Sequence, residues 1–483
     1  MKLLEPIDIN GMVVANRVVV PAMVTRLSGG DGFVNQDIID RYVRYGEGGV
    51  GLIVVEAMAI HDSKSGPLLR ISDDQFVPGL AYLAARVHDA SDSKIVPQII
   101  HFLKVARSGW RQTLDTLSRA DIDLIIEQFG DACARAREAG FDGAELHSAH
   151  AYTLASFLSR VNPRDDEFTG KTLEGRLRMI GLVMENVRRK VGKDFPLGIR
   201  FLADEYIKDG YTITDAKLIA LRLAQLGFDY LSLSVGGKFE DAVHKDSEVL
   251  YPYTGYSGDR CMPGAWFPPA LHVHLGGEIK AFITQKGFDT PVMIAGKISD
   301  PEDAERLVAA GVVDMVAIAR GLLADPDWVR KVREDRRERI VQCDYCNWCK
   351  ELDGAHEKVR CIIWPKETLQ APPYALANEA PAWPEGGAGL AADYADGAVT
   401  LRWGKALGSV AGYDIYRADD DGKLKAIRAV RAQRWTDRSV MGGIAYRYHV
   451  RARDAAGMPS APSNTAVVKP EPSSVPAASQ ANE

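Results

Sequence analysis

Apolar positions in the first two thirds of the chain follow two alternating patterns. Short runs rich in β-branched residues alternate with longer stretches in which apolar residues recur at helical spacing. A run that is apolar throughout is typical of a strand that is buried on both faces, as in a parallel sheet. The predicted strands cover residues 17–21, 51–57, 95–100, 143–147, 197–201, 230–235, 291–295 and 315–318.

Helical patterns lie between these strands and complete a regular alternation. Ser118, three residues before Asp121, predicts one helix start, and Thr214 predicts another. Eight strand–helix units before residue 340 predict an α/β fold, a (β/α)8 TIM barrel. A doubly wound open sheet is the alternative, but no Gly-x-Gly-x-x-Gly follows the first strand. The clearest predicted helices cover residues 118–139, 173–190, 215–226 and 301–310.

Beyond about residue 380 the pattern changes to short hydrophobic–polar alternations separated by glycine and aspartate. This alternation is typical of an all-β sandwich, and the segment of residues 381–470 resembles a fibronectin type III module. Trp403 is the expected core tryptophan, and Tyr446 or Tyr448 is expected near a tyrosine corner. Residues 367–380 form a predicted linker, and residues 471–483 a tail predicted to be disordered. The alternating runs are residues 399–403, 412–417, 435–437 and 446–452.

Composition and charge exclude several classes of partner. The chain has 483 residues, 46% of them hydrophobic, and a net charge of −6 with acids and bases interspersed. No basic face is therefore expected for nucleic acid or anionic lipid. No apolar run reaches the roughly 18 residues of a membrane span, and the first residues lack the apolar core of a signal peptide. We expect a cytoplasmic protein.

Four of the six cysteines form one motif. Cys343, Cys346, Cys349 and Cys361 follow the spacing C-x2-C-x2-C-x11-C. Two successive short gaps place three thiolates on one tight turn, which suits a 4Fe–4S cluster with four cysteine ligands. Zinc is an alternative, although structural zinc sites more often use two separated pairs. Disulfides are a second alternative, but cysteines on a tight loop make poor bridges. The predicted cluster segment covers residues 341–366.

Polar residues gather where the predicted barrel strands end, which is where barrel enzymes place their chemistry. Small or basic residues after the last two strands precede helices, an arrangement that commonly binds a phosphate. Taken one at a time, each has an ordinary structural interpretation, such as a turn or a buried histidine. The candidates are Gln98, His101, His147, His150, Tyr152, Arg200, Gly296, Lys297, Ala319 and Arg320.

Long stretches of the chain resemble the old yellow enzyme family. The resemblance covers residues 3–366 and is closest to the iron–sulfur branch that includes 2,4-dienoyl-CoA reductase, 2-enoate reductase and trimethylamine dehydrogenase. The stretches that show it are Asn16-Arg17, Pro21-Ala22-Met23, residues 139–152, 157–159 and 314–326, and the cysteine motif with Pro365.

The resemblance implies a role for most of the candidate residues. His147 and His150 match the pair that binds a substrate oxygen over FMN, and Tyr152 matches the tyrosine that protonates the substrate carbon. Non-covalent FMN is expected, because Val24 stands where relatives often have cysteine or threonine. The implied FMN-binding residues are Pro21, Ala22, Met23, Ala57, Gln98 and Arg200 at the ring, and Gly296, Lys297, Ala319 and Arg320 at the phosphate.

These features predict an FMN- and 4Fe–4S-dependent oxidoreductase. Its expected reaction is the reduction of a C=C bond conjugated to a carbonyl, with hydride from the flavin N5 and a proton from Tyr152. NADH, NADPH or a separate redox protein is the expected electron donor. The expected substrate is a small molecule, and we expect the enzyme to form a homo-oligomer. One alternative is an amine or N-methyl dehydrogenase or demethylase that passes electrons through the cluster. The other is a non-catalytic flavin scaffold.

Overall fold

The computed structural model describes residues 1–471 except 63–65, 105–111, 239–254, 366, 375–379, 420–421, 423 and 456. The chain folds into two compact units. The barrel unit comprises Met1–Arg337, Tyr345–Ile362 and Glu367–Gln370. The C-terminal unit comprises Glu338–Asp344, Ile363–Lys366 and Ala371–Glu483. The predicted domain boundaries stay predictions, and the predicted tail lies almost entirely outside the described residues.

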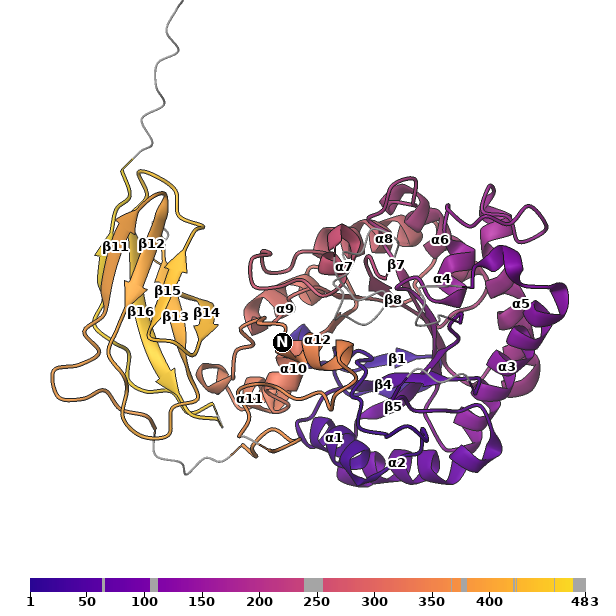
Figure 1. The fold of residues 1–483 in the computed structure, drawn as a ribbon, viewed down its shortest axis with the longest axis horizontal. Helices are drawn as coiled ribbons and strands as arrows, with labels where there is room; N and C mark the ends of the chain where they lie inside the picture. Colours follow the sequence, from indigo (N-terminus) through magenta and orange to yellow (C-terminus); the bar gives the residue numbers. More distant parts are fainter. Residues whose placement is uncertain are drawn as a thin grey trace, which may run out of the picture. The chain divides into compact units, whose positions relative to one another are not determined.

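Eight parallel strands of the barrel unit close in the order β10-β3-β4-β5-β6-β7-β8-β9, with helices around them (Figure 1). The predicted α/β barrel is therefore confirmed, and each predicted strand matches an observed one to within about two residues. Almost every strand residue is buried, which explains the continuous apolar runs. The strands are β3 (Val18–Val20), β4 (Leu52–Ala59), β5 (Lys94–Ile100), β6 (Ala144–Ser148), β7 (Leu197–Leu202), β8 (Tyr230–Ser234), β9 (Val292–Ala295) and β10 (Met315–Ala317).

A short antiparallel hairpin packs against residues of the barrel strands. It pairs β1 (Ile7–Ile9) with β2 (Met12–Val14), and its turn residues Asn10 and Gly11 both have positive φ, as tight hairpin turns require. The hairpin side chains share one apolar cluster with residues from several barrel strands, including Val19 of β3. Sequence reasoning missed this hairpin because its strands are too short to show a period.

The helices follow the alternation predicted from the sequence. Ser118 and Asp121 form the expected capping box at the start of α3. The predicted start at Thr214 was wrong by two residues, because extended backbone ends at Thr212 and the helix begins at Ile213. Among the described residues, no helix has the length and apolar character needed to cross a membrane. Helices of this unit include α1 (Gln36–Glu47), α3 (Arg119–Glu138), α4 (Thr153–Leu158), α5 (Leu173–Val191), α6 (Ile213–Gln225), α7 (Gly255–Cys261), α10 (Arg320–Ala324) and α12 (Trp348–Gly354).

Shorter or peripheral helices complete the barrel unit. The other helices of this unit are α2 (Val77–Ala90), α8 (Val273–Gln285), α9 (Pro301–Ala309) and α11 (Trp328–Arg333), together with 3-10 turns at Lys2–Leu4, Asp74–Phe76 and Leu114–Thr116. A further 3-10 turn, Arg337–Arg339, begins at the last barrel residue before the C-terminal unit.

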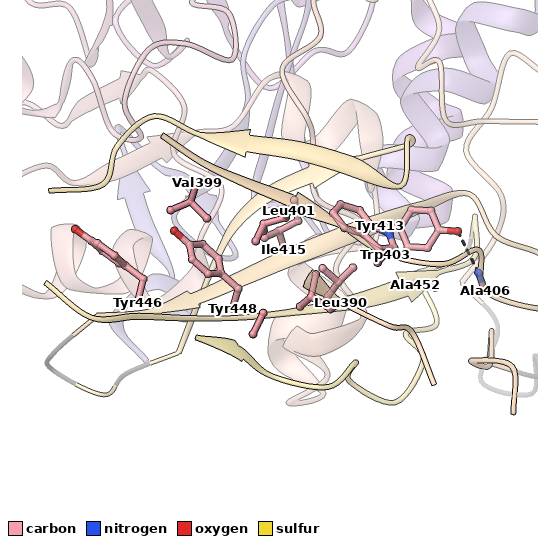
Figure 2. Packing of buried hydrophobic residues seen from close by; sticks show 12 residues of the cluster. Leu390, Val399, Leu401, Trp403, Ala406, Tyr413, Ile415, Tyr446, Tyr448 and Ala452 are labelled. Carbon is pink, nitrogen blue, oxygen red and sulfur yellow. Dashed lines mark hydrogen bonds between the residues drawn. The ribbon is translucent and has the colours of Figure 1, made fainter. Parts of the chain in front are cut away.

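The C-terminal unit consists of two antiparallel sheets around one apolar core. Trp403 lies in this core, with its ring 5.6 Å from that of Tyr413 (Figure 2). The Tyr446 hydroxyl accepts a hydrogen bond from the Met441 N–H at 2.9 Å. The likeness of the C-terminal unit to a fibronectin type III module stays a prediction. The sheets are β11 (Ala391–Ala395), β12 (Ala398–Arg402) and β15 (Arg434–Asp437), and β14 (Lys425–Val430), β13 (Gly412–Ala418), β16 (Tyr446–Arg453) and β17 (Ala466–Val468).

Residues just before the cysteine motif belong to the C-terminal unit. Arg453 is buried, pairs with Asp414 at 2.9 Å and donates to the Gln342 carbonyl at 3.2 Å. Arg431 forms an ion pair with Asp344 at 3.5 Å. The residues on either side of Cys343 are therefore held by the sheets of this unit.

A buried carboxyl makes the stability of the barrel unit depend on pH. Glu205 follows β7, is 1% exposed, and accepts a hydrogen bond from the Tyr211 N–H at 2.6 Å. Burial raises its pKa from 4.5 to about 7. The folded protein therefore binds more protons than the unfolded chain between about pH 4.5 and 7, so this group destabilises the fold as pH rises through that window.

We predict that Glu205→Gln reduces the pH dependence of unfolding. The native protein should lose stability between pH 5 and 8, and the variant should lose on the order of 2–3 kcal/mol less over that range, because glutamine does not ionise. Urea unfolding at the two pH values measures the difference. Equal losses in both proteins would show that Glu205 ionises as easily in the folded state as in the unfolded chain.

Candidate active site

The end of β6 brings three predicted site residues together. His147 lies on the strand, and a tight turn follows in which His150 and Ala151 adopt left-handed backbone with φ of 58° and 62°. This turn returns the chain so that the His147 ring lies 5.1 Å from that of His150 and 5.0 Å from that of Tyr152. Gly237, after β8, allows this close approach, because a Cβ there would lie 2.5 Å from the His150 Cα.

Hydrogen bonds indicate which nitrogen of each imidazole bears a proton. The Ala149 N–H donates to the His147 Nδ1 at 3.2 Å, so the His147 proton lies on Nε2. That nitrogen lies 3.3 Å from the His150 Nδ1, and the His150 Nε2 lies 2.7 Å from the Ser234 Oγ. These hydrogen bonds form a chain from the Ala149 N–H through both rings to Ser234. The ring N–H groups of His147 and His150 both donate in the direction of Ser234.

Both imidazoles are neutral at physiological pH. His147 is 4% exposed, and burial together with the nearby Arg200 lowers its pKa to about 3. Burial and the charges of His147 and Arg200 lower the pKa of His150 well below 6.5. Neutral imidazoles can donate hydrogen bonds to a substrate oxygen without bringing a net positive charge.

Arg200 is a buried cation at the end of β7. It pairs with His147 across the β6–β7 ladder and is 8% exposed. Its Nε makes no hydrogen bond, and its guanidinium makes no ion pair, within the described residues. A guanidinium stays protonated in proteins, so its burial favours an anionic partner at this position. The negative edge of a reduced flavin ring is such a partner.

Other residues implied at the flavin ring surround the same strand ends. Ala57 on β4 lies beside Gln98 on β5, and the Gln98 amide donates to the buried Glu145 at 2.6 Å. Pro21 follows β3 and is buried, whereas Ala22 and Met23 are only partly buried. These positions are compatible with the predicted contacts, which stay predictions.

The residues implied at the phosphate take mixed orientations. Gly296, at the end of β9, has φ of 140°, and a Cβ there would lie 2.8 Å from the His272 ring, so only glycine fits. Lys297 donates to the carbonyls of Gly264 at 3.1 Å and Ala265 at 3.3 Å. Its ammonium also lies 4.5 Å from the Tyr345 ring. The Lys297 side chain is thus already engaged by neutral groups, and only rearrangement would bring it to a phosphate.

Arg320 approaches the same aromatic ring from β10. It begins α10 after Ala319, its guanidinium lies 4.9 Å from the Tyr345 ring, and it donates to the Asn347 amide oxygen. Tyr345 and Asn347 have left-handed backbone on both sides of Cys346. The turn of the cysteine motif is therefore anchored over cations from the strand ends.

The four cysteines of the motif are divided between the two units. Cys346, Cys349 and Cys361 belong to the barrel unit, whereas Cys343 belongs to the C-terminal unit. Burial raises the pKa of Tyr45, on α1, to about 12, and the charges of Cys349 and Cys361 contribute to this rise. No three histidine, cysteine, aspartate or glutamate side chains in the described part of the chain are grouped closely enough to hold a metal ion. The cluster therefore stays a prediction from spacing.

Sequence reasoning missed two polar residues that organise the site. Ser234 ends β8, and its hydroxyl accepts a hydrogen bond from the His150 Nε2–H. Thr153 follows Tyr152, and its hydroxyl is hydrogen-bonded to the His101 ring at 2.7 Å. Ser234 could have been found as a polar residue at a strand end. Nothing in the sequence indicates the contact of Thr153.

Comparison with known proteins identifies the family. The model of the NADH:flavin oxidoreductase / NADH oxidase family matches residues 2–245 and 269–339. The chain belongs to this family. Its barrel unit therefore belongs to the same class of flavin proteins as the relatives described next.

The matched relatives include both reductases and amine dehydrogenases. An NADH oxidase from Thermoanaerobacter brockii is 34% identical over 360 residues, covering 70% of this chain and 52% of the relative. An N,N-dimethylglycine/sarcosine dehydrogenase from Chromohalobacter salexigens is 28% identical over 393 residues, covering 74% and 52%. The chain thus spans about half the length of these curated relatives.

A solved structure shares the fold. A 2-naphthoyl-CoA reductase in complex with 2-naphthoyl-CoA superposes with a TM-score of 0.65 at 23% identity, covering 79% of this chain and 60% of that one. At this identity the likeness supports the barrel architecture alone.

We predict that neither His147 nor His150 titrates between pH 5 and 8, because burial and Arg200 disfavour both imidazolium forms. Nitrogen-15 NMR of histidine-labelled protein distinguishes neutral from protonated rings, and assignment follows from His147→Gln and His150→Gln. A resonance of either ring that moves with a midpoint near pH 6 would contradict the neutral pair.

Proposed function

We propose that this protein is an FMN-dependent oxidoreductase that reduces a C=C bond conjugated to a carbonyl. The observation that supports this most is the assembly of His147, His150 and Tyr152 on one turn beside the buried cation Arg200. Two hydrogen-bond donors, an acid and a cation are the groups that such a reduction needs. Because the chain covers half of its curated relatives, the activity of the whole protein is part of the proposal.

The residues present fit a bound flavin. Arg200 would lie at the ring edge that becomes negative on reduction. Gly296, which follows β9, would lie at the phosphate, as the family resemblance implies. Bound FMN supplies hydride from its N5, and a family of this description makes NADH or NADPH the expected donor. Pro21, Ala22, Met23, Ala57, Gln98, Lys297, Ala319 and Arg320 complete the proposed binding set.

The histidine pair would bind the substrate carbonyl. An enolate oxygen develops negative charge as hydride reaches the β-carbon, and fixed donors stabilise that charge. In the structure the His147 Nε2–H points to His150, and the His150 Nε2–H points to Ser234. A substrate oxygen must therefore take over at least one of these hydrogen bonds, and the 3.3 Å contact between the rings is the weaker of the two.

Tyr152 would donate the proton that completes the reduction. Its ring lies edge-on to His147, and its backbone N–H bonds to the Ala149 carbonyl, which fixes it at the start of α4. A phenol is an acid of suitable strength toward an enolate carbon. Solvent can then reprotonate the phenolate, because Tyr152 is only partly buried.

Oxidation of a methylated amine is the second candidate. The similarity to the dimethylglycine/sarcosine dehydrogenase favours it. His147 argues against it, because the amine dehydrogenases of this family tend to have a tyrosine at the corresponding position. Anaerobic mixing separates the candidates. Bleaching by NAD(P)H with reoxidation by an enone supports alkene reduction, bleaching by a methylated amine supports dehydrogenation, and neither result would indicate a non-catalytic flavin scaffold.

We also propose that Cys343, Cys346, Cys349 and Cys361 bind a 4Fe–4S cluster. Their number, their spacing and the left-handed turn around Cys346 support this. The cluster would exchange single electrons, so a separate redox protein could replace NAD(P)H as electron donor. A small-molecule substrate, a homo-oligomeric state and a cytoplasmic location remain part of the same proposal.

Tyr152→Phe should slow alkene reduction by about 100- to 10,000-fold, the usual contribution of a positioned acid. Reduction of the flavin by NAD(P)H should be unchanged, because no proton from Tyr152 enters that half-reaction. Stopped-flow absorbance measures the two half-reactions separately. Tyr256→Phe is the control, since Tyr256 is 60% exposed on α7. Equal alkene reduction by both variants would remove Tyr152 from its proposed role.

Arg200→Ala should weaken FMN binding and lower the midpoint potential of the flavin that remains bound, because the reduced ring loses its cationic neighbour. Redox titration of the FMN-saturated variant gives the potential. An unchanged or higher potential would mean that Arg200 does not lie at the negative edge of the ring.

Cys346→Ser should remove the broad visible absorbance of the cluster, and the native protein should contain about four iron and four sulfide per chain. Cys261→Ser is the matched control, because Cys261 lies outside the motif and is also partly exposed. Metal analysis that found one zinc and no sulfide in the native protein would replace the cluster with a structural zinc site.

A further inference from the structure

A buried carboxyl lies at an irregular position of the barrel. In the β4–β5 ladder Val55 faces Pro97 and Ala57 faces Gln98, so Glu56 is the extra residue of a β-bulge. Bulges change the direction of a side chain and are frequent next to active sites. Glu56 is 1% exposed. The bulge therefore directs an ionisable group into the interior immediately before Ala57, a proposed flavin contact.

Each oxygen of the Glu56 carboxyl accepts a hydrogen bond from Thr25, in the loop that follows β3. The carboxyl accepts the Thr25 N–H and, at 2.9 Å, the Thr25 hydroxyl. The Thr25 hydroxyl also accepts the Leu27 N–H at 3.2 Å. A hydroxyl can donate or accept, so the same contact serves an ionised and a protonated carboxyl. Either protonation state of Glu56 can thus be accommodated without moving the backbone.

Charged and titratable groups face Glu56 from two other segments. The Tyr42 hydroxyl of α1 accepts the Glu56 N–H at 2.8 Å, and the guanidinium groups of Arg41 and Arg26 act on the carboxyl. Both arginines favour the ionised form. Burial outweighs them and raises the pKa of Glu56 from 4.5 to about 7. Burial and the neighbouring Glu56 carboxyl raise the pKa of Tyr42 well above 10, so the phenol stays neutral.

The segment that binds Glu56 also contacts the cysteine segment within the barrel unit. The Thr25 carbonyl accepts the Val359 N–H at 2.8 Å. Arg26 forms an ion pair with Asp353 at 2.8 Å, on the helix α12 that contains Cys349. Glu56 therefore lies between residues proposed to contact the flavin and residues that flank the proposed cluster ligands.

We propose that Glu56 is a redox-linked proton acceptor. When a hydride donor or a one-electron donor adds negative charge to the neighbouring cofactors, the carboxylate takes one proton from solvent and forms one O–H bond. When the electrons leave, it releases that proton, and no other bond changes. The inference rests on the proposed cofactors but not on the proposed substrate.

The test uses Glu56→Gln, because glutamine reproduces the shape and hydrogen bonds of a protonated carboxyl. Glu205→Gln is the matched control, since Glu205 is equally buried and has a pKa raised to a similar value. The midpoint potential of bound flavin is measured from about pH 5.5 to 8.5. Above about pH 7 the Glu56→Gln potential should stay higher and fall less steeply than the native one, and Glu205→Gln should follow the native curve.

Infrared difference spectra of the native protein give a second, variant-independent measurement. Reduction near pH 7.5 should produce the C=O band of a protonated buried carboxyl, and this band should be missing in Glu56→Gln. Identical potential curves for native protein and Glu56→Gln, equal flattening in Glu205→Gln, or no carboxyl band on reduction would each overturn the proposal.

The outcomes separate this inference from the proposed reaction. A protein that shows the Glu56 effect but reduces no enone retains the proton acceptor and loses the alkene reductase assignment. A protein that reduces enones but shows no Glu56 effect retains the reaction and loses the proton acceptor. A protein without any flavin would remove both.

Discussion

Burial of positive charge at the C-terminal ends of the barrel strands is the constraint on which the proposed site depends. A guanidinium is charged in proteins, and that of Arg200 lies beside His147 with little solvent to screen it. Its field and the burial together hold both histidines neutral, so they can act as donors but not as cations. The same charge favours a flavin ring that accepts electrons. Burial is thus the main cause of the neutral histidines, and Arg200 adds to it while it also acts on the proposed cofactor.

The pKa values of buried carboxyls in the barrel unit also depend on burial and on nearby positive charge. Burial raises the pKa of Glu145, and Arg200 opposes that rise, so this carboxyl and the Arg200 guanidinium influence each other within the strand layer. Other arginines act on Glu56 and Glu205, and burial raises the pKa of each to about 7, where a small change in local charge alters protonation. Their burial costs stability at neutral pH. Glu56 also lies between two proposed redox centres. A role in balancing their charge is a physical reason for a buried carboxyl at this position, in spite of the stability that it costs.

Much of the fold could be predicted because burial on both faces leaves a strong pattern. The eight barrel strands are apolar runs, and the capping box at Ser118 is a local signal that survives in the structure. The hairpin of β1 and β2 could not be predicted, since each of its strands is only three residues long. The candidate site residues could be placed at strand ends by the same reasoning, and the structure brings His147, His150 and Tyr152 onto one turn.

Directions of side chains and protons lie beyond what the sequence provides. Lys297 is at the expected strand end, but its ammonium donates to the carbonyls of Gly264, Ala265 and Phe267. The proton on His147 is fixed by the Ala149 amide, a contact created by the left-handed turn. Glu56 is an unremarkable acid within an apolar run until the ladder register shows it to be a bulge residue. In each case the deciding feature is a hydrogen bond or a strand register that forms only in the folded chain. Patterns of residue type identify which groups can do the chemistry, and the backbone geometry decides which way they face.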